Sequence, residues 1–431
     1  MKKIINYLIY LFIFLLPWQT RWIYKQGQIN GKNWEYGTFA VYATEAILAL
    51  IFILASAYLV KEIRKQKNKK TKKQKSQNAL YALLIIAGFC ASCYLAISPA
   101  IAFYKLTYLI AGAAFCLVLV AIKPNFEKIS LAIIFSGIIQ SGIAIQQFAT
   151  QKVIASKYLG MAAQDPQTLG TPVVNFNGTR FLRAFGSLPH PNILAGFLLI
   201  SILLIIGLIV ISKNKKLHKL LPLAFVVNFI GLLTTLSRAA LLAFLVSIIF
   251  MAFWTRKDKI FSRAVTKFAL IAMLIIILFT VSFPGLIATR AFGTDRLENI
   301  SNQTRLEQYS KFTGLIKDYW IFGAGLGNYT LASYLNNPGL NGFAYQPIHN
   351  TYLLIFTELG LLGAMLLLTF VFYLYYSISR FKNWSNQQII SFSCLVALCV
   401  IALFDHYLWS FYFGIILTVL VLIFTVKTNK S

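Results

Sequence analysis

Long apolar segments recur along the whole chain, from Ile4 to Val426, with no soluble block between them. A helix needs about 20 mostly apolar residues to cross a bilayer, and inside lipid its backbone polar groups must be satisfied within the segment. Only 12% of the 431 residues are charged and 58% are hydrophobic, whereas about a quarter of the residues in a soluble domain are charged. We therefore predict an all-α polytopic membrane protein in which residues 1–431 form a single transmembrane domain.

About twelve apolar runs have the length of a transmembrane helix. Their starts fall near Ile4, Phe39, Ala79, Ala102, Ile129, Pro191, Leu220, Ala239, Phe268, Asn350, Gln388 and Trp409.

The net charge of +28 comes from basic residues that cluster in short connectors between these runs. With the N-terminus inside, all the strongly basic connectors fall on one side of the membrane, which is the positive-inside pattern and indicates orientation, not nucleic-acid binding. This pattern predicts cytoplasmic termini and a basic cytoplasmic loop at 61–78. The two long loops at 150–189 and 289–348 are then extracytoplasmic.

Ionisable residues in or beside the predicted spans gather at the outer ends of those spans. Such residues are costly inside lipid, so their shared position at the outer ends of several spans points to function. Each one alone could instead be a helix-end residue whose side chain reaches the headgroups. Three helix starts carry polar motifs on this side, and helix N-termini are natural seats for phosphate. The motifs are Pro189-His190-Pro191-Asn192, Ser237-Arg238 and Pro347-Ile348-His349-Asn350-Thr351, and further polar positions are Glu45, Glu358, Asp405 and His406.

The second outer loop contains an amphipathic pattern from Thr304 to Trp320, which predicts a surface helix and makes this loop partly helical. Thr304 and Glu307 have capping-box spacing, so we expect Arg305 in the first turn, either on a ligand or as an interface anchor. In the first outer loop, Arg183 either guides an anionic substrate or is simply solvated.

A glycine-rich stretch, Phe322 to Asn328, resembles a dinucleotide fingerprint only superficially, because no strand precedes it and it faces outward. We expect it to let the loop backbone turn tightly or approach a ligand.

Four motifs in order resemble the O-antigen ligase family, over roughly Phe185 to Leu362. They are Phe185-Gly186-Ser187-Leu188-Pro189-His190-Pro191-Asn192, Thr235-Leu236-Ser237-Arg238, Thr304-Arg305-Leu306 leading to Phe322-Gly323-Ala324-Gly325-Leu326-Gly327-Asn328, and His349-Asn350-Thr351-Tyr352-Leu353 with Glu358-Leu359-Gly360.

This resemblance implies a GT-C-like helical fold and the transfer of a glycan from undecaprenyl diphosphate to an acceptor hydroxyl on the outer face of the bacterial plasma membrane. The acceptor is lipid A-core, another glycan repeat or a protein. For this chain the resemblance implies that Arg238 and Arg305 contact the donor diphosphate and that His349 is the base. Possible further substrate contacts are His190, Asn192, Arg183, Asn350 and Glu358.

Elementary chemistry agrees with these roles. Arginines can stabilise the charge on a departing diphosphate, and with twelve acidic residues and no D-x-D motif the chain has no obvious carboxylate site for a metal. We therefore expect metal-independent, inverting transfer without a cofactor, with His349 near its usual pKa of about 6.5 able to accept a proton.

Two other classes remain as alternatives. A flippase or transporter of lipid-linked glycans would need many spans but no chemistry, and would usually place its charged site near the bilayer midplane, often within repeats. A structural partner in an envelope assembly would leave Arg238, Arg305 and His349 without a purpose.

Overall fold

The computed structural model describes residues 1–66, 86–293, 296–380 and 384–427. Within this part, eight helices are long and apolar enough to cross a membrane. They are α2 (Ala43–Gln66), α4 (Pro99–Ile122), α5 (Phe126–Thr150), α6 (Pro191–Ile211), α7 (Lys215–Thr234), α8 (Arg238–Thr255), α9 (Lys259–Ser282) and α13 (Thr351–Arg380). Shorter helices α1 (Lys2–Leu15), α14 (Asn386–Ala402) and α16 (Tyr412–Lys427) pack with them. The protein is an all-α polytopic membrane protein, as predicted.

Most predicted span starts fall within a few residues of an observed helix start, and α6 begins at Pro191 as expected. Two starts are wrong. Phe39 opens strand β4 (Phe39–Tyr42), and the helix begins only at Ala43, whereas α9 already begins at Lys259, well before the predicted start at Phe268. The predicted span near Ala79 begins outside the described residues, although residues 86–94 are helical. Most of the predicted basic loop 61–78 also lies outside them.

Helix α6 forms the centre of the bundle. Its sequence is apolar on every side, and a helix of this kind is stable only when it is surrounded. It packs against α5, α7, α8, α9 and α14, and 89% of its most apolar 18-residue stretch is buried. Its first residues are therefore held firmly, and they carry His190 and Asn192 to one end of the bundle.

Helix α9 is far more exposed than α6, because only 17% of its most apolar 18-residue stretch is buried. Its exposed side chains include Leu270, Leu274 and Ile277. An apolar surface of this kind is expected to face lipid.

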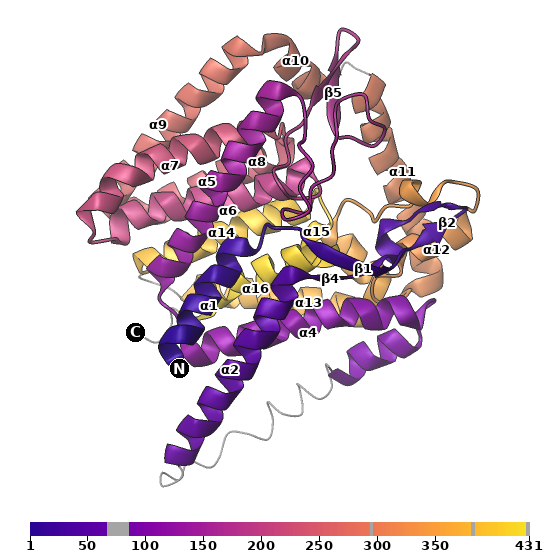
Figure 1. Ribbon diagram of the computed structural model, residues 1–431, viewed down its shortest axis with the longest axis horizontal. Coiled ribbons are helices and arrows are strands. Elements are labelled where there is room, and N and C mark those ends of the chain that lie inside the picture. Colours follow the sequence, from indigo (N-terminus) through magenta and orange to yellow (C-terminus); the bar gives the residue numbers. More distant parts are fainter. Residues whose placement is uncertain (67–85, 294–295, 381–383, 428–431) are drawn as a thin grey trace.

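Short hairpins and helices gather at the end of the bundle opposite to the two termini (Figure 1). β1 (Arg21–Lys25) pairs antiparallel with β4, β2 (Gln28–Ile29) with β3 (Lys32–Asn33), and β5 (Val173–Phe176) with β6 (Thr179–Leu182). The same end holds α10 (Pro284–Phe292), α11 (Arg296–Tyr319), α12 (Tyr329–Asn336) and α15 (Tyr407–Ser410), with 3-10 turns η1 (Glu35–Gly37) and η2 (Gly342–Ala344). The polar helix starts converge at this end.

The glycine-rich stretch packs on a kink in α13. Gly323 and Gly325 have positive φ, as does Gly360 at the kink. The N–H groups of Ala324 and Gly325 donate to the carbonyl oxygens of Thr357 and Glu358 at 2.9 and 3.0 Å. A side chain at Gly323 would clash with the backbone of Glu358, so the expectation of tight backbone turning is confirmed.

Candidate active site

Three arginines converge on one cavity of about 380 Å³, which we call the arginine cavity. They are Arg238 at the start of α8, Arg290 in α10 and Arg305 in α11. The other lining residues are Asn192, Ser237, Ala239, Leu242 and Phe404. Each guanidinium group is permanently charged and carries five N–H donors, so the cavity suits a multiply charged anion such as a diphosphate.

The backbone in front of α8 links two of these arginines. Leu236 has a left-handed φ of 51°, which is a strained conformation for a bulky residue. Its carbonyl oxygen accepts a hydrogen bond from Arg290 Nε at 3.0 Å, and Arg238 Nη1 donates to the carbonyl oxygen of Arg290 at 3.1 Å. This turn therefore ties α8 to α10. Ser237 is the N-cap residue of α8, as predicted, although its side chain makes no capping hydrogen bond.

Arg305 enters the cavity from a helix that is longer than predicted. The capping-box spacing of Thr304 and Glu307 predicted a helix start at Thr304, but α11 begins at Arg296. Arg305 is therefore an interior residue, and the prediction of a first-turn position is wrong. The half-buried side chain still lines the cavity, so its contribution is its own charge and not that of a helix N-terminus.

A buried polar chain leads from the arginine cavity to a second cavity. Arg183 is only 8% exposed and donates from Nη2 to Asn192 Oδ1 at 2.8 Å and from Nε to the carbonyl oxygen of Thr235 at 3.0 Å. Asn192 Nδ2 in turn donates to Asp405 Oδ2 at 2.8 Å. The alternative of a simply solvated Arg183 is wrong, because this side chain positions Asn192.

The second cavity, of about 200 Å³, is lined by His190, His349, Asp405 and His406, and we call it the histidine cavity. The ring centroids of His349 and His406 lie 5.3 Å apart. His190 caps α6, where its Nδ1 accepts the N–H of Asn192 at 3.2 Å, and His349 lies two residues before α13. Two of the three predicted helix starts thus meet here, and the third, that of α8, opens into the arginine cavity.

Burial favours the neutral form of these histidines. Burial lowers the pKa of His406 to about 3, and Asp405 opposes this shift only in part. Burial, assisted by the charge of Arg183, also lowers the pKa of His190 well below its ordinary value. Burial acts to raise the pKa of Asp405, but interactions with the three histidines and the amide of Asn192 keep it below its usual value. The cavity therefore holds neutral imidazoles beside one carboxylate.

The proton on the His349 ring is placed by Gln308. The Nδ1 of His349 lies 2.9 Å from Gln308 Oε1, which also accepts the backbone N–H of His349 at 3.2 Å. Because an amide oxygen only accepts, Nδ1 carries the proton and the lone pair of Nε2 is available. Burial, with a smaller contribution from Arg305, lowers the pKa of His349, and Asp405 opposes the shift. His349 is therefore neutral at neutral pH, with Nε2 as a hydrogen-bond acceptor.

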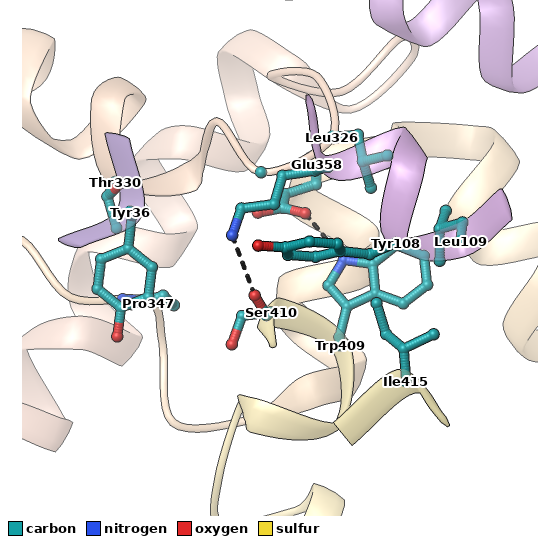
Figure 2. Close-up of a pocket in the computed structure, with 12 residues that line it drawn as sticks. Tyr36, Tyr108, Leu109, Leu326, Thr330, Pro347, Glu358, Trp409, Ser410 and Ile415 are labelled. Carbon is teal, nitrogen blue, oxygen red and sulfur yellow. Dashed lines mark hydrogen bonds between the residues drawn. The ribbon is translucent and has the colours of Figure 1, made fainter. Parts of the chain in front are cut away.

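Besides Arg183, two predicted substrate contacts line neither cavity. Asn350 is 9% exposed, and its Oδ1 accepts the N–H groups of Tyr352 and Leu353 at 3.0 and 3.1 Å, so it caps α13. Glu358 faces a separate small chamber, where its Oε2 accepts the indole N–H of Trp409 at 2.8 Å (Figure 2). Glu358 is therefore not brought together with the arginines and histidines.

The arrangement places positive charge on one side of the Asn192–Asp405 hydrogen bond and neutral imidazoles on the other. An anionic leaving group and a proton-donating nucleophile could thus be bound in adjacent cavities, as a displacement reaction requires. Among the described residues, no group of three or more His, Cys, Asp or Glu side chains is placed to hold a metal ion.

Two site residues are absent from the predictions. Arg290 lies in a short helix whose limits are visible in the sequence, because Pro284 opens it and Gly293 ends it in a left-handed conformation. That pattern could have indicated a helix that presents Arg290. Gln308 has no comparable signal, since its role depends on packing between α11 and α13.

Residues 223–368 match the model of a protein family described as O-Antigen ligase. The match contains Arg238, Arg290, Arg305, Gln308 and His349. No curated protein matches the chain.

Proposed function

We propose that this chain is a membrane glycosyltransferase of the O-antigen ligase and polymerase type, and the family match at residues 223–368 supports this proposal. In this proposal it moves a glycan from undecaprenyl diphosphate to an acceptor hydroxyl on the outer face of the bacterial plasma membrane. The observation that carries the proposal is the pair of adjacent cavities, one with three arginines and one with His349.

The donor diphosphate would bind in the arginine cavity. Arg238 and Arg305, joined by Arg290, would hold its oxygens through charge-assisted hydrogen bonds. As the bond between the anomeric carbon and the phosphate oxygen breaks, its electron pair passes to the diphosphate. The arginines would stabilise the charge that develops there, without a metal or another cofactor.

The acceptor hydroxyl would approach from the histidine cavity. Nε2 of His349 would take the hydroxyl proton while the oxygen attacks the anomeric carbon from the side opposite to the diphosphate. A single displacement of this kind inverts the anomeric configuration. His190 lines the histidine cavity and Asn192 lines the arginine cavity. Both would contact the sugar that is transferred, with Arg183 and Asp405 holding Asn192 in place.

Three acceptors are compatible with this chemistry, namely lipid A-core, a second lipid-linked glycan repeat and a protein hydroxyl. The alternative function is a flippase for lipid-linked glycans. The enzyme is favoured because a flippase gains nothing from a histidine whose Nδ1 proton is fixed by Gln308 and whose Nε2 is left as an acceptor.

The proposal is tested with purified protein in liposomes that contain an undecaprenyl diphosphate-linked glycan. Each candidate acceptor is added in turn, and glycan transfer and release of undecaprenyl diphosphate are followed without metal or nucleotide. Release that depends on one acceptor supports a transferase and identifies its branch. Movement of the lipid-linked glycan between leaflets without release would instead support the flippase.

The variants Arg238→Ala and His349→Ala should abolish transfer without preventing membrane insertion, because both residues lie outside the apolar cores of their spans. Insertion is checked by recovery of the folded protein from membranes. Wild-type turnover in both variants would refute the mechanism.

A further inference from the structure

A third cavity, of about 410 Å³, lies directly beside the histidine cavity. One wall comes from the N-terminal segment between Arg21 and Thr38, and the other comes from residues 342–346. Glu35, Tyr36 and Gln346 line both cavities. We call this third cavity the hairpin cleft. The hairpin cleft is separate from the arginine cavity, because the two have no lining residue in common.

The N-terminal wall of the hairpin cleft is fixed to the segment that precedes the other wall, and β3 also packs against η2. Asn30 Nδ2 donates to the carbonyl oxygen of Leu340 at 2.8 Å, and the indole N–H of Trp34 donates to Thr330 Oγ1 at 3.2 Å. Trp34 is only 6% exposed, so this contact is part of a packed core. The cleft is therefore preformed, as ligand sites usually are.

The lining of the hairpin cleft combines hydrogen-bonding groups with an exposed aromatic ring. Arg21 and Glu35 form an ion pair whose side chains remain 27% and 44% exposed, and Asn33 and Gln346 add amide groups. The ring of Phe343 is 63% exposed, although an aromatic side chain would normally be covered. Paired donors and acceptors with one flat apolar surface match a sugar ring, which has hydroxyl groups at its edge and C–H groups on its faces.

The hairpin cleft also leads to the proposed base. Gln346 is three residues before His349 along the chain, and Tyr36 lies between the cleft and the histidines. The Tyr36 hydroxyl is 3.4 Å from His406 Nε2, and the two rings are in edge-to-face contact with centroids 5.9 Å apart. A ligand in the cleft would therefore extend into the histidine cavity from the side away from the arginines.

We propose that the hairpin cleft binds the carbohydrate end of the acceptor and presents one of its hydroxyl groups to His349. This inference rests on the proposed function, since it assigns an acceptor subsite to the same reaction. It commits to a carbohydrate acceptor, because the lining suits a sugar ring and its walls are preformed. It also gives the N-terminal hairpins, which lie outside the family match, the task of selecting the acceptor.

The test measures two ligands on the same protein in lipid nanodiscs by calorimetry. The first is a free acceptor glycan, given as the lipid A-core oligosaccharide and as the glycan released by mild acid from the host cell's lipid-linked pool, and the second is undecaprenyl diphosphate without sugar. Phe343→Ala and Gln346→Ala should weaken glycan binding by about threefold to tenfold, the range expected for one stacked ring or one hydrogen bond. Binding of undecaprenyl diphosphate should not change in these variants.

Tyr158→Ala is the matched control, because Tyr158 is a 77% exposed aromatic residue that lines neither the hairpin cleft nor the histidine cavity. It should leave both affinities at the wild-type value. Unchanged glycan binding in both cleft variants would overturn the inference, as would a wild-type protein that binds undecaprenyl diphosphate and a serine-containing peptide but not the glycan. Failure of the proposed function is a different result, in which the wild type neither binds undecaprenyl diphosphate nor transfers glycan.

Discussion

The proposed base depends on one amide oxygen. Gln308 Oε1 accepts both the ring Nδ1–H and the backbone N–H of His349, so it fixes the tautomer and the orientation of the imidazole together. Without this acceptor the ring could rotate or carry its proton on Nε2, where it could not act as a base. The position of a proton-accepting nitrogen must be accurate, because small displacements cost large factors in rate.

Gln308→Leu should therefore lower the turnover number by about ten- to a hundred-fold while the affinity for undecaprenyl diphosphate is kept. Leucine is similar in size but accepts no hydrogen bond. Single-turnover transfer rates and diphosphate binding are measured on the same preparation. Gln303→Leu, an exposed change in the same helix, is the control and should remain active. Full turnover in Gln308→Leu would show that Gln308 does not orient the base.

The pH dependence of transfer should report the lowered pKa of His349. Burial holds that pKa below the ordinary value of about 6.5, so the ring stays neutral and active as the pH falls through 6.5. The acidic limb of the pH–rate profile should thus have its midpoint below about 6.5. In Gln308→Glu, the added carboxylate would favour the imidazolium, and the midpoint should move upward. A wild-type midpoint above 6.5, or no shift in the glutamate variant, would contradict this assignment.

At the level of elements, hydropathy located the helices but not the hairpins. Residues 39–42 form β4 because they pair with β1 (Arg21–Lys25). This partner is distant in the sequence, so the hydropathy of residues 39–42 and their neighbours gives no sign of the pairing. The start of α11 was misplaced for a related reason. Thr304 and Glu307 have the spacing of a cap, but residues 296–303 contain no proline or glycine, so the helix continues through them. Local spacing indicates where a helix could begin, whereas the full segment decides where it does.

Gly360→Ala should destabilise the protein, because Gly360 has a φ of 56° at the kink of α13 and a Cβ there would clash with the carbonyl of Ile321. The expected cost is about 1–3 kcal/mol, seen as a lower midpoint of thermal unfolding in detergent.

Gly314→Ala provides the opposite case on α11. Gly314 lies inside the helix, and a Cβ there would meet nothing within 4 Å. This change should leave the unfolding midpoint unchanged or raise it, by an amount equivalent to about 0.5–1 kcal/mol. If both variants had equal midpoints, the left-handed conformation of Gly360 would not be a constraint on stability.

At the level of the whole molecule, the candidate active site is assembled from segments that are distant in the sequence. The motifs around His190, Arg238 and His349 could be found locally, because each marks a helix start. Arg290 and Gln308 could not be assigned roles in this way, since their contacts cross from α10 to the start of α8 and from α11 to the start of α13. Glu358 shows the converse, because it was predicted to lie at the same level as the other polar residues but faces a separate chamber. A shared level along the membrane normal does not specify a shared cavity.

The proposed orientation of the whole chain can be tested by cysteine labelling. Leu169 is 91% exposed in the loop 150–189, and Lys257 is exposed in the basic connector between α8 and α9. If basic connectors face the cytoplasm, Leu169→Cys should react with a membrane-impermeant maleimide in intact spheroplasts, whereas Lys257→Cys should react only after permeabilisation. The wild-type chain gives the background from its five native cysteines. Labelling in the reverse order would place the arginine and histidine cavities on the cytoplasmic side, and an extracytoplasmic transferase would then be excluded.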